Sequence, residues 1–279
     1  AMSPAPHRLV AGRVRRVSRR PSVGLSGVLA RLDRRGRWVQ PPGDAALPGF
    51  TWDEDDGLSP RWYPQGITAA PGGEPVLLTS WYARGFMRWW HGARISVVDL
   101  GDDDGPRYRH VRLVRPVRGL GLRRPAWIHA GGLAWYGPHL FVACGREGLR
   151  VFRVDDVRRG LLGGFVLPES TALASENDEG SVPFTYSFVS VERDADGDRL
   201  VAGEYGRAGG SHRLVRYALD PSTHLPVADT YGVSVPLEVH EDQAPRMQGA
   251  TVVDGTWFVT ASSGEDNPGD LWVGTPGLL

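Results

Sequence analysis

The chain has 279 residues, 32 of them basic and 32 acidic, and a single cysteine, Cys144. Because the charges balance, no global field draws the protein to nucleic acid or to an anionic membrane, and one cysteine excludes an intramolecular disulfide. No apolar run reaches the roughly 18 residues of a membrane-spanning helix, so we expect neither nucleic-acid nor membrane partners.

The N-terminal stretch, residues 1–22, is basic, rich in proline and serine, and without the periodicity of a buried element. We predict a flexible arm here, or an edge strand laid over the surface. Because its arginines are not followed by an apolar stretch, an intact signal peptide is not predicted. We expect a cytoplasmic protein, with secretion after removal of a leader as the alternative, and a single domain over residues 23–279.

Two further segments precede the regular part of the chain. Val23–Val39 holds two short apolar pieces around the turn-prone DRRG, which predicts an outer hairpin. The acidic run Asp53–Asp56 lacks the alternating spacing of a Ca²⁺ loop, so we expect a solvated loop. No metal or cofactor is expected, since the chain has no P-loop, dinucleotide-binding, His-Glu-x-x-His or Cys-x-x-Cys pattern.

In the regular part of the chain, one pattern recurs about four times. It has three parts, and each part is an apolar run of strand length. The first runs are Pro64–Ala70, His129–Trp135, Tyr186–Glu192 and Met247–Val253, and the second are Val76–Tyr82, Leu140–Gly145, Arg199–Tyr205 and Trp257–Ser263. The third runs begin at Ala93, Leu149, His212 and Asp270, and their register positions Arg94, Arg150, Arg213 and Leu271 lie 56, 63 and 58 residues apart.

Strand-length runs separated by Gly, Pro and Asp turns at such a period are typical of β-propeller blades. The sequence therefore predicts an all-β fold, a five-bladed β-propeller with four visible blades and the N-terminal segment closing the ring; four blades are the alternative if that segment supplies one strand. Fourth strands are expected at Tyr108–Arg115, Gly164–Leu167 and Val227–Val235. The polar insert Val157–Val182 predicts a surface excursion or a lid.

Several phrases occur together in these repeats: WYPQGIT at Trp62–Thr68, IHAGGLAWYG at Ile128–Gly137 and LVAGEY at Leu200–Tyr205, with LLTSWY, GLRVFRV and MQGA. Their combination resembles a family of actinobacterial β-propeller proteins, mostly described as secreted or hypothetical. The resemblance extends from about Trp62 to the C-terminus and implies a fold, without an activity. The absence of lysine, together with abundant glycine, alanine and proline, also fits a high-GC bacterium.

Equivalent positions of successive blades meet at one channel mouth, so polar residues that recur in register predict a shared cavity. The first runs place Gln65 and Gln248 in one register, with His129 on the same strand face, and the second runs end near Glu204. The candidate catalytic residues are Glu204 and His129, and the candidate substrate-binding residues are Gln65, Gln248, Tyr63, Trp81, Tyr82, Trp127, Tyr186, Tyr205, Trp89 and Trp90.

Glu204 follows the apolar run LVAG, which is expected to carry its carboxyl group inward. Loss of hydration raises the pKa of a carboxyl into the range that acid–base catalysis uses, and His129 is the expected partner. In the alternative interpretation Glu204 pairs with an inward arginine such as Arg84 or Arg207, and His129 and the glutamines satisfy backbone groups.

The segment Phe86–Trp90 carries more apolar surface than a solvent loop needs, so we expect it over the channel mouth or against a partner. The leading hypothesis is a propeller that binds a small organic molecule, uncharged or aromatic, in an aromatic-lined central pocket. It would act without a cofactor as a tailoring enzyme of actinobacterial specialised metabolism, of cyclase, lyase or hydrolase type. The alternatives are a non-catalytic propeller that binds carbohydrate or protein, and a structural propeller completed by another chain or by a homo-oligomer.

Overall fold

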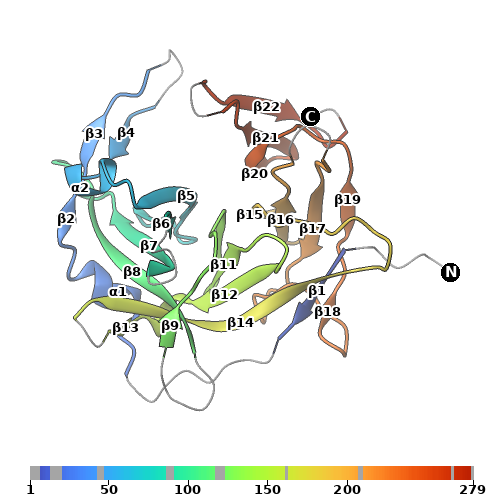
Figure 1. Ribbon diagram of the computed structural model, residues 1–279, viewed down its shortest axis with the longest axis horizontal. Helices are drawn as coiled ribbons and strands as arrows, with labels where there is room; N and C mark the ends of the chain where they lie inside the picture. Colours follow the sequence, from blue (N-terminus) through green and yellow to red (C-terminus); the bar gives the residue numbers. More distant parts are fainter. Residues whose placement is uncertain are drawn as a thin grey trace. The chain divides into compact units, whose positions relative to one another are not determined.

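The computed structural model describes residues 7–12, 21–42, 47–85, 91–116, 123–160, 163–206, 210–264 and 267–277. The protein is mostly β, with 49% strand and 6% helix (Figure 1), which confirms the predicted all-β class. No helix among these residues is long and apolar enough to cross a membrane.

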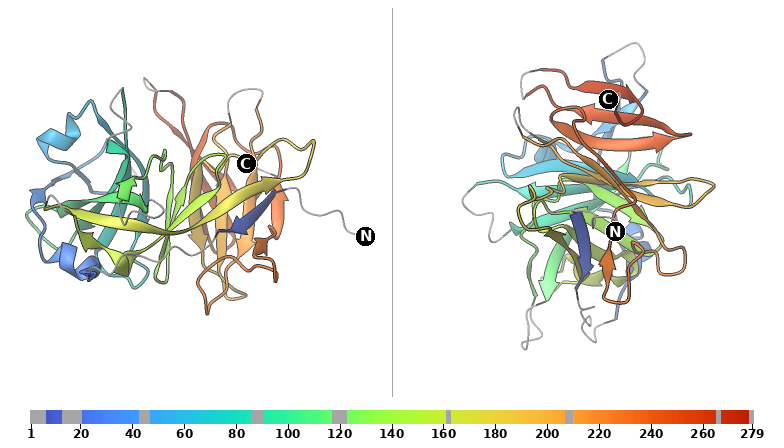
Figure 2. Two further views of the ribbon diagram at one scale, coloured as in Figure 1. Left: turned by 60° about the horizontal axis from the view of Figure 1, so that its bottom comes forward. Right: turned by 90° about the vertical axis from the view of Figure 1, so that its right-hand side faces the viewer.

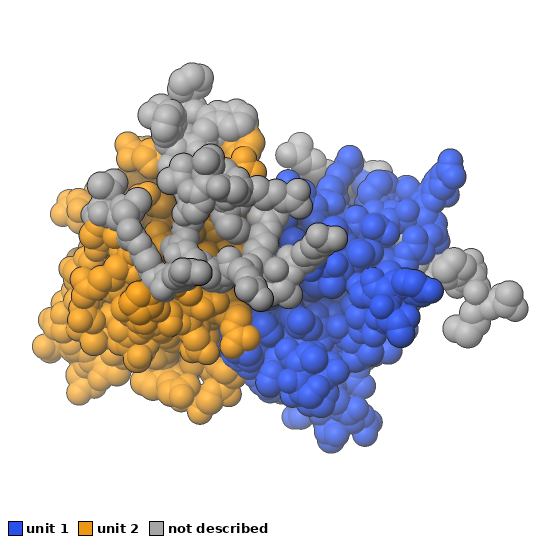
Figure 3. Space-filling model, turned by 90° about the horizontal axis from the view of Figure 1, so that it is seen from below, with its two compact units in different colours: residues 1–16, 130–152, 170–279 blue, residues 17–129, 153–169 orange. Residues whose placement is uncertain are grey.

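Contacts within the chain divide it into two compact units (Figure 3). Unit 1 comprises residues 1–16, 130–152 and 170–279, and unit 2 comprises residues 17–129 and 153–169. The prediction of a single domain over residues 23–279 made no such division.

Unit 2 contains the first copy of the repeat as four antiparallel strands that follow chain order in the sheet. The second and third strands are almost continuously buried, which is why VLLTSWYA and ARISVVD are mostly apolar and do not alternate between apolar and polar residues. The strands are β5 (Trp62–Ala69), β6 (Val76–Ala83), β7 (Ala93–Asp99) and β8 (Arg107–Pro116), and β9 (Arg123–Pro125) is hydrogen-bonded to the end of β8.

The segment before β5 is not the hairpin predicted over Val23–Val39. It begins with a helix, α1 (Gly24–Leu29), because Leu25, Val28 and Leu29 follow the spacing of three to four residues of a helix face. Short elements follow: β2 (Arg34–Arg35), which pairs with β8, then β3 (Arg37–Val39) and β4 (Gly49–Thr51), which pair with each other, and α2 (Glu54–Gly57) on the acidic run.

Unit 1 contains the other three copies, each a set of neighbouring antiparallel strands around a buried aromatic and aliphatic core. The second copy is β10 (Leu133–Tyr136), β11 (His139–Ala143) and β12 (Leu149–Arg153), which leads into the short helix η1 (Val154–Asp156). The third is β15 (Phe188–Glu192), β16 (Arg199–Gly203), β17 (Leu214–Ala218) and β19 (Glu238–His240), and the fourth is β20 (Met247–Val253), β21 (Thr256–Ala261) and β22 (Asp270–Gly274). The fourth strand expected over Val227–Val235 is therefore β19, and only β18 (Val233–Ser234) lies in that range.

A long strand, β14 (Phe165–Asn177), occupies the insert predicted as an excursion or lid, after the short β13 (Arg158–Arg159). One end of β14 pairs in parallel with β8, and the other pairs antiparallel with β1 (His7–Ala11), seen in yellow and dark blue in Figure 2. β1 also pairs with β18, so these residues of the predicted arm form a strand with a partner on each side, which is neither a flexible arm nor an edge strand. The polar residues Glu169, Ser170 and Thr171 in the middle of β14 are buried, and Ser170 donates a hydrogen bond to the carbonyl of Val151 at 2.9 Å.

The main sheet is a barrel-like path of eight strands, and not a propeller. Its strands are hydrogen-bonded in the order β10-β11-β12-β14-β8-β7-β6-β5. The propeller prediction, with five blades or four, is wrong, because a propeller keeps its four-stranded blades separate, whereas β14 and β8 pair with each other and join two repeats. The N-terminal segment does not close a ring either, since β1 pairs with β14 and β18, and β2 pairs with β8.

Gly148 turns the chain into β12 and has no room for a side chain. Its φ is +89°, and a Cβ atom would lie 2.2 Å from the carbonyl oxygen of Leu173 on β14. Gly145, in the same turn, has a φ of +61° but open space around the Cβ position. We expect Gly145→Ala to lower the free energy of unfolding by about 1 kcal/mol, from its left-handed backbone alone, and Gly148→Ala to lower it clearly more. Urea denaturation measures both losses, and equal losses would contradict the close approach to β14.

Candidate functional site

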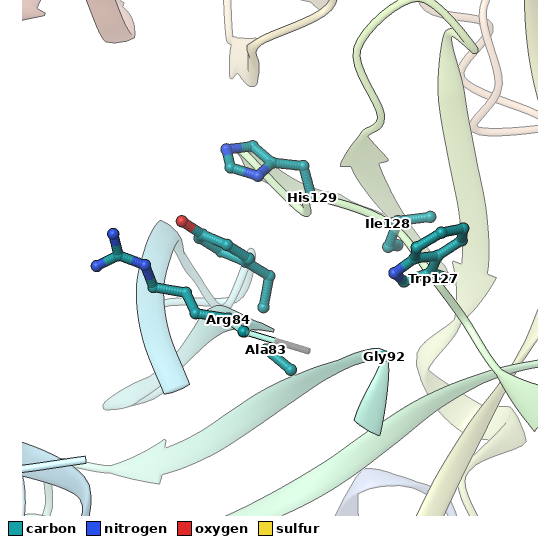
Figure 4. Close-up of a pocket in the computed structure, with 8 residues that line it drawn as sticks. Ala83, Arg84, Gly92, Trp127, Ile128 and His129 are labelled. Atoms are coloured by element: carbon teal, nitrogen blue, oxygen red, sulfur yellow. The ribbon is translucent and has the colours of Figure 1, made fainter. Parts of the chain in front are cut away.

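One pocket of unit 2 gathers three of the predicted site residues (Figure 4). Its volume of about 450 Å³ lies within the range of small-molecule sites. The end of β6, the residue before β7 and the segment after β9 contribute to it. The lining residues are Tyr82, Ala83, Arg84, Gly85, Gly92, Trp127, Ile128 and His129.

Backbone hydrogen bonds bring the three segments of the pocket together. Tyr82 on β6 pairs with Ala93 on β7, and the amide of Ala93 donates to the carbonyl of Ala126 at 2.9 Å. Gly92 permits this approach, because its φ is +63° and a Cβ atom would lie 2.7 Å from the carbonyl oxygen of Ala126. Residues 127–129 are thereby placed beside the end of β6.

Aromatic rings form much of the pocket surface. The rings of Tyr82 and His129 lie 4.4 Å apart between centroids and are tilted by 46°. Trp127 lines the same pocket and leaves 43% of its surface exposed. Tyr63, on β5, extends the aromatic surface, since its ring centroid lies 6.1 Å from that of Tyr82. These flat apolar faces suit an organic ring, for which stacking contributes on the order of 1 kcal/mol beyond burial.

Arg84 supplies a cation at the same place. Residues 82 and 84 lie on the same face of an extended chain, which explains why both reach the pocket. The guanidinium carbon of Arg84 lies 4.7 Å from the centroid of the Tyr63 ring, and its backbone amide donates to the carbonyl of Arg61 at 2.7 Å. Within the described part of the chain no carboxylate forms an ion pair with Arg84, so its N–H groups are available to a ligand.

His129 is the titratable group of the pocket whose pKa is shifted. Its ring opens toward the pocket, yet the surrounding protein atoms displace water, and this burial lowers the pKa of the imidazole from its ordinary value. The ring is therefore neutral near pH 7. Neither ring nitrogen has a hydrogen-bond partner among the described residues, so the acceptor nitrogen is open to a proton of a bound molecule.

Two other predicted residues of unit 2 lie elsewhere. Trp81 is fully buried and donates a hydrogen bond from its indole nitrogen to Ser96 Oγ at 2.7 Å, which leaves no surface for a substrate. It points to the opposite face of β6 from Tyr82, as the alternation of a strand requires. Gln65 donates to the carbonyl of Pro64 at 2.9 Å and does not line the pocket. We assign both residues a structural role.

Glu204 lies in unit 1 and is held by an arginine. Both side chains are almost fully buried, and Arg213 donates to the two carboxylate oxygens from Nε at 2.8 Å and from a terminal nitrogen at 2.9 Å. The amide of Thr185 donates to the same carboxylate at 2.9 Å. This arrangement matches the alternative in which Glu204 pairs with an inward arginine, although that arginine is Arg213; Arg207 lies outside the described residues. We therefore assign Glu204 a structural role instead of a catalytic one.

Three of the remaining predicted residues, Tyr186, Tyr205 and Gln248, belong to unit 1. Tyr186 is fully buried, with its hydroxyl 2.7 Å from that of Tyr217, and burial raises its pKa well above the usual value. The amide of Tyr205 donates to Ser187 Oγ at 2.9 Å, and Gln248 is exposed on β20. Trp89 and Trp90, with the rest of the segment Phe86–Trp90, lie outside the described residues.

The acidic run holds a buried network that the sequence analysis missed. Asp56 on α2 is not solvated: it accepts hydrogen bonds from Arg94 at 2.6 Å, from the Tyr108 hydroxyl at 2.7 Å and from His110 Nε2 at 2.8 Å. Arg34 adds an ion pair, with a guanidinium nitrogen 3.3 Å from the carboxylate. Burial by itself raises the pKa of Asp56, but the hydrogen bonds and charges of these groups outweigh it and hold the pKa well below the usual range.

The Asp56 network continues inward as a chain of donors. Trp81 donates to Ser96 Oγ, whose hydroxyl donates to His110 Nδ1 at 2.9 Å, and His110 Nε2 donates to Asp56. The two ends of this chain are fixed because indole only donates and a carboxylate only accepts, and a neutral His110 that donates from Nε2 accepts at Nδ1. Burial lowers the pKa of His110, in agreement with a neutral ring. The order Ser, His, Asp resembles a nucleophile with its base, but Ser96 is fully buried, so we assign the network to stability.

A second pocket, of about 440 Å³, lies around α2 and holds none of the predicted residues. One wall is Trp62, whose ring carries the Arg94 guanidinium 4.2 Å from its centroid. No group of three His, Cys, Asp or Glu side chains suited to a metal ion is present among the described residues. Comparison of the chain with protein-family models, curated proteins and solved structures gives no match.

Proposed function

We propose that the protein binds a small aromatic molecule in the pocket of Tyr82, Trp127 and His129. The observation that carries this proposal is the meeting of three residues, chosen from the sequence for their chemistry, in one pocket of small-molecule size. The open ring of His129 beside an exposed tryptophan favours a ligand that stacks and donates a hydrogen bond to the imidazole.

We further propose that the pocket performs acid–base chemistry with His129 as the proton acceptor. A neutral imidazole can take a proton from a bound molecule near pH 7, which is the first step of an elimination or of many cyclisations. The aromatic faces of Tyr82 and Trp127 would stabilise positive charge that develops on the substrate. These groups need no cofactor, and a tailoring step in the specialised metabolism of a high-GC bacterium remains the proposed context.

A ligand screen tests the binding proposal. Saturation-transfer NMR with a panel of small aromatic compounds and simple sugars is expected to give aromatic binders, and Trp127→Ala is expected to weaken them about tenfold. Trp38→Ala is the matched control, because Trp38 lies in the same unit, is 39% exposed against 43% for Trp127, and does not line the pocket. Equal binding to the two variants would place the ligand elsewhere, and binding of sugars alone would favour a carbohydrate-binding module.

The catalytic role of His129 is tested on the compounds that bind. Incubation with the protein, followed by mass spectrometry, is expected to show conversion of a binder by elimination or cyclisation. His129→Gln keeps a hydrogen-bonding side chain but cannot accept the proton, so binding is expected to persist while conversion falls at least about a hundredfold. Unchanged conversion by His129→Gln would exclude the acid–base role.

A further inference from the structure

We infer that the ligand of this pocket is an aromatic monocarboxylate whose carboxylate group binds Arg84. The inference rests on the proposed small-molecule function and adds the chemical class of the ligand. It replaces the expectation of an uncharged ligand, which was formed without Arg84 among the site residues.

The first argument for a carboxylate ligand is the charge of the residues that line the pocket. Arg84 is the charged residue among the described lining residues, and the neutral His129 adds no charge near pH 7. Within the described part of the chain, Arg84 has no carboxylate partner. A guanidinium beside apolar rings therefore gives the pocket one uncompensated positive charge, which a ligand with one negative charge neutralises.

The second argument for a carboxylate ligand is the position of Tyr63 beside Arg84. The Arg84 guanidinium lies over the Tyr63 ring, 4.7 Å from its centroid. A cation–π contact of this kind restricts the side chain without using its N–H donors, so the fork of donors is already held in place before a ligand arrives. A carboxylate matches that fork with two parallel hydrogen bonds, at little cost in side-chain entropy.

The number of cations favours a carboxylate over a phosphate. A phosphate monoester carries more than one negative charge near pH 7 and offers three acceptor oxygens, which sites usually meet with several donors. The described lining of this pocket offers one arginine. The aromatic part of the ligand would then lie against Tyr82, Trp127 and His129, which line the same pocket.

Matched pairs of ligands test the inference by isothermal titration calorimetry. The probes are benzoate with benzamide, phenylacetate with phenylacetamide, and indole-3-acetate with its amide, and phenyl phosphate is added as a separate anion. For the pair that binds best, we expect the carboxylate to bind at least about tenfold more tightly than the amide, and the preference to disappear in Arg84→Gln. Arg37→Gln is the control, because Arg37 is an exposed arginine of the same unit outside the pocket, and it is expected to keep the preference.

The outcomes separate this inference from the proposed function. Equal affinity for carboxylate and amide, or a preference that survives Arg84→Gln, overturns the inference and leaves aromatic binding intact. Tighter binding of phenyl phosphate than of any carboxylate overturns the choice of carboxylate. If no aromatic compound binds the unaltered protein, the proposed function and the inference fail together. Circular dichroism of Arg84→Gln, whose altered side chain is exposed, checks that the variant is folded.

Discussion

Glu204→Gln is expected to lower the free energy of unfolding by about 3–5 kcal/mol, because it leaves the guanidinium of Arg213 buried without its counter-charge. Glu204 is 2% exposed and Arg213 is 4% exposed, so water cannot replace the lost charge. The carboxylate accepts from the amide of Thr185, from the amide of Arg213 and from two guanidinium nitrogens. Glutamine offers one accepting oxygen, so its NH₂ group must face N–H donors at the other position. Urea denaturation measures the loss.

The structure also predicts which segments Glu204→Gln destabilises first. Arg213 donates to His7 on β1 at 2.8 Å and to the carbonyl groups of Val182 and Pro183. Hydrogen–deuterium exchange of Glu204→Gln is therefore expected to rise in β1 and around residues 182–186 before it rises in the core strands of the unit.

Two further variants identify the Glu204–Arg213 pair as the cause. Glu241, 60% exposed and 4.0 Å from the Arg213 Nε, is the matched control, and Glu241→Gln is expected to cost about 0.5 kcal/mol or less. The double variant Glu204→Leu, Arg213→Met removes both charges and is expected to be more stable than Glu204→Gln. A loss of less than about 1 kcal/mol in Glu204→Gln, or a double variant no more stable than the single one, would contradict this explanation.

Asp56→Asn is expected to cost about 3 kcal/mol or more, because Arg94 keeps its charge beside an amide and the donors from Tyr108 and His110 lose an acceptor. Asp55→Asn is a close control: Asp55 is the preceding residue of α2, carries the same charge, and its side chain is 87% exposed. We expect a change of about 0.5 kcal/mol or less there. Equal effects of the two substitutions on the urea midpoint would show that the network contributes no more than a surface charge.

The acid sensitivity of the protein follows from the same carboxylate. The pKa of Asp56 is held below its ordinary value of 3.8 in the folded protein, so its contribution is complete above about pH 4 and is lost as the pH falls below 3.8. Asp56→Asn removes that dependence. We expect the stability gap between the unaltered protein and Asp56→Asn to be constant from pH 7 to about pH 5 and to narrow below pH 4. A gap that widens with acid would contradict the direction of the shift.

The strands were largely predictable, because a buried strand corresponds to a short apolar run that can be recognised locally in the sequence. The run Val76–Tyr82 matches β6 (Val76–Ala83), Met247–Val253 matches β20, and Tyr108–Arg115 lies within β8. Apolar runs of this length end at Gly, Pro and Asp because those residues suit the turns. The pairing of the strands was not predictable from these apolar runs, because pairing between β14 and β8 depends on contacts between distant parts of the chain. The repeat gave the strands, and the propeller inferred from it was wrong.

The site was predictable to the extent that its residues are aromatic or titratable. Tyr82, Trp127 and His129 drew notice by residue type, and they share a pocket. Arg84 was considered only as a partner of Glu204, although its spacing of two residues from Tyr82 signals a shared strand face. Glu204 had two interpretations because an inward carboxylate looks alike in sequence whether its neighbour is a substrate or a buried arginine. Asp56 was misassigned because four acidic residues in a row give no sign of which one turns inward.

The position of β1 sets an order of events during synthesis. His7 is hydrogen-bonded to Arg213, 206 residues further along the chain, and β1 also pairs with β18. A ribosome adds on the order of 5–20 residues per second, so roughly 10–40 seconds separate the emergence of β1 from that of Arg213. Throughout that interval β1 lacks its partner β18, which is synthesised after Arg213. A chaperone that shields extended segments near the ribosome is therefore expected to raise the yield of native protein most when it acts on β1.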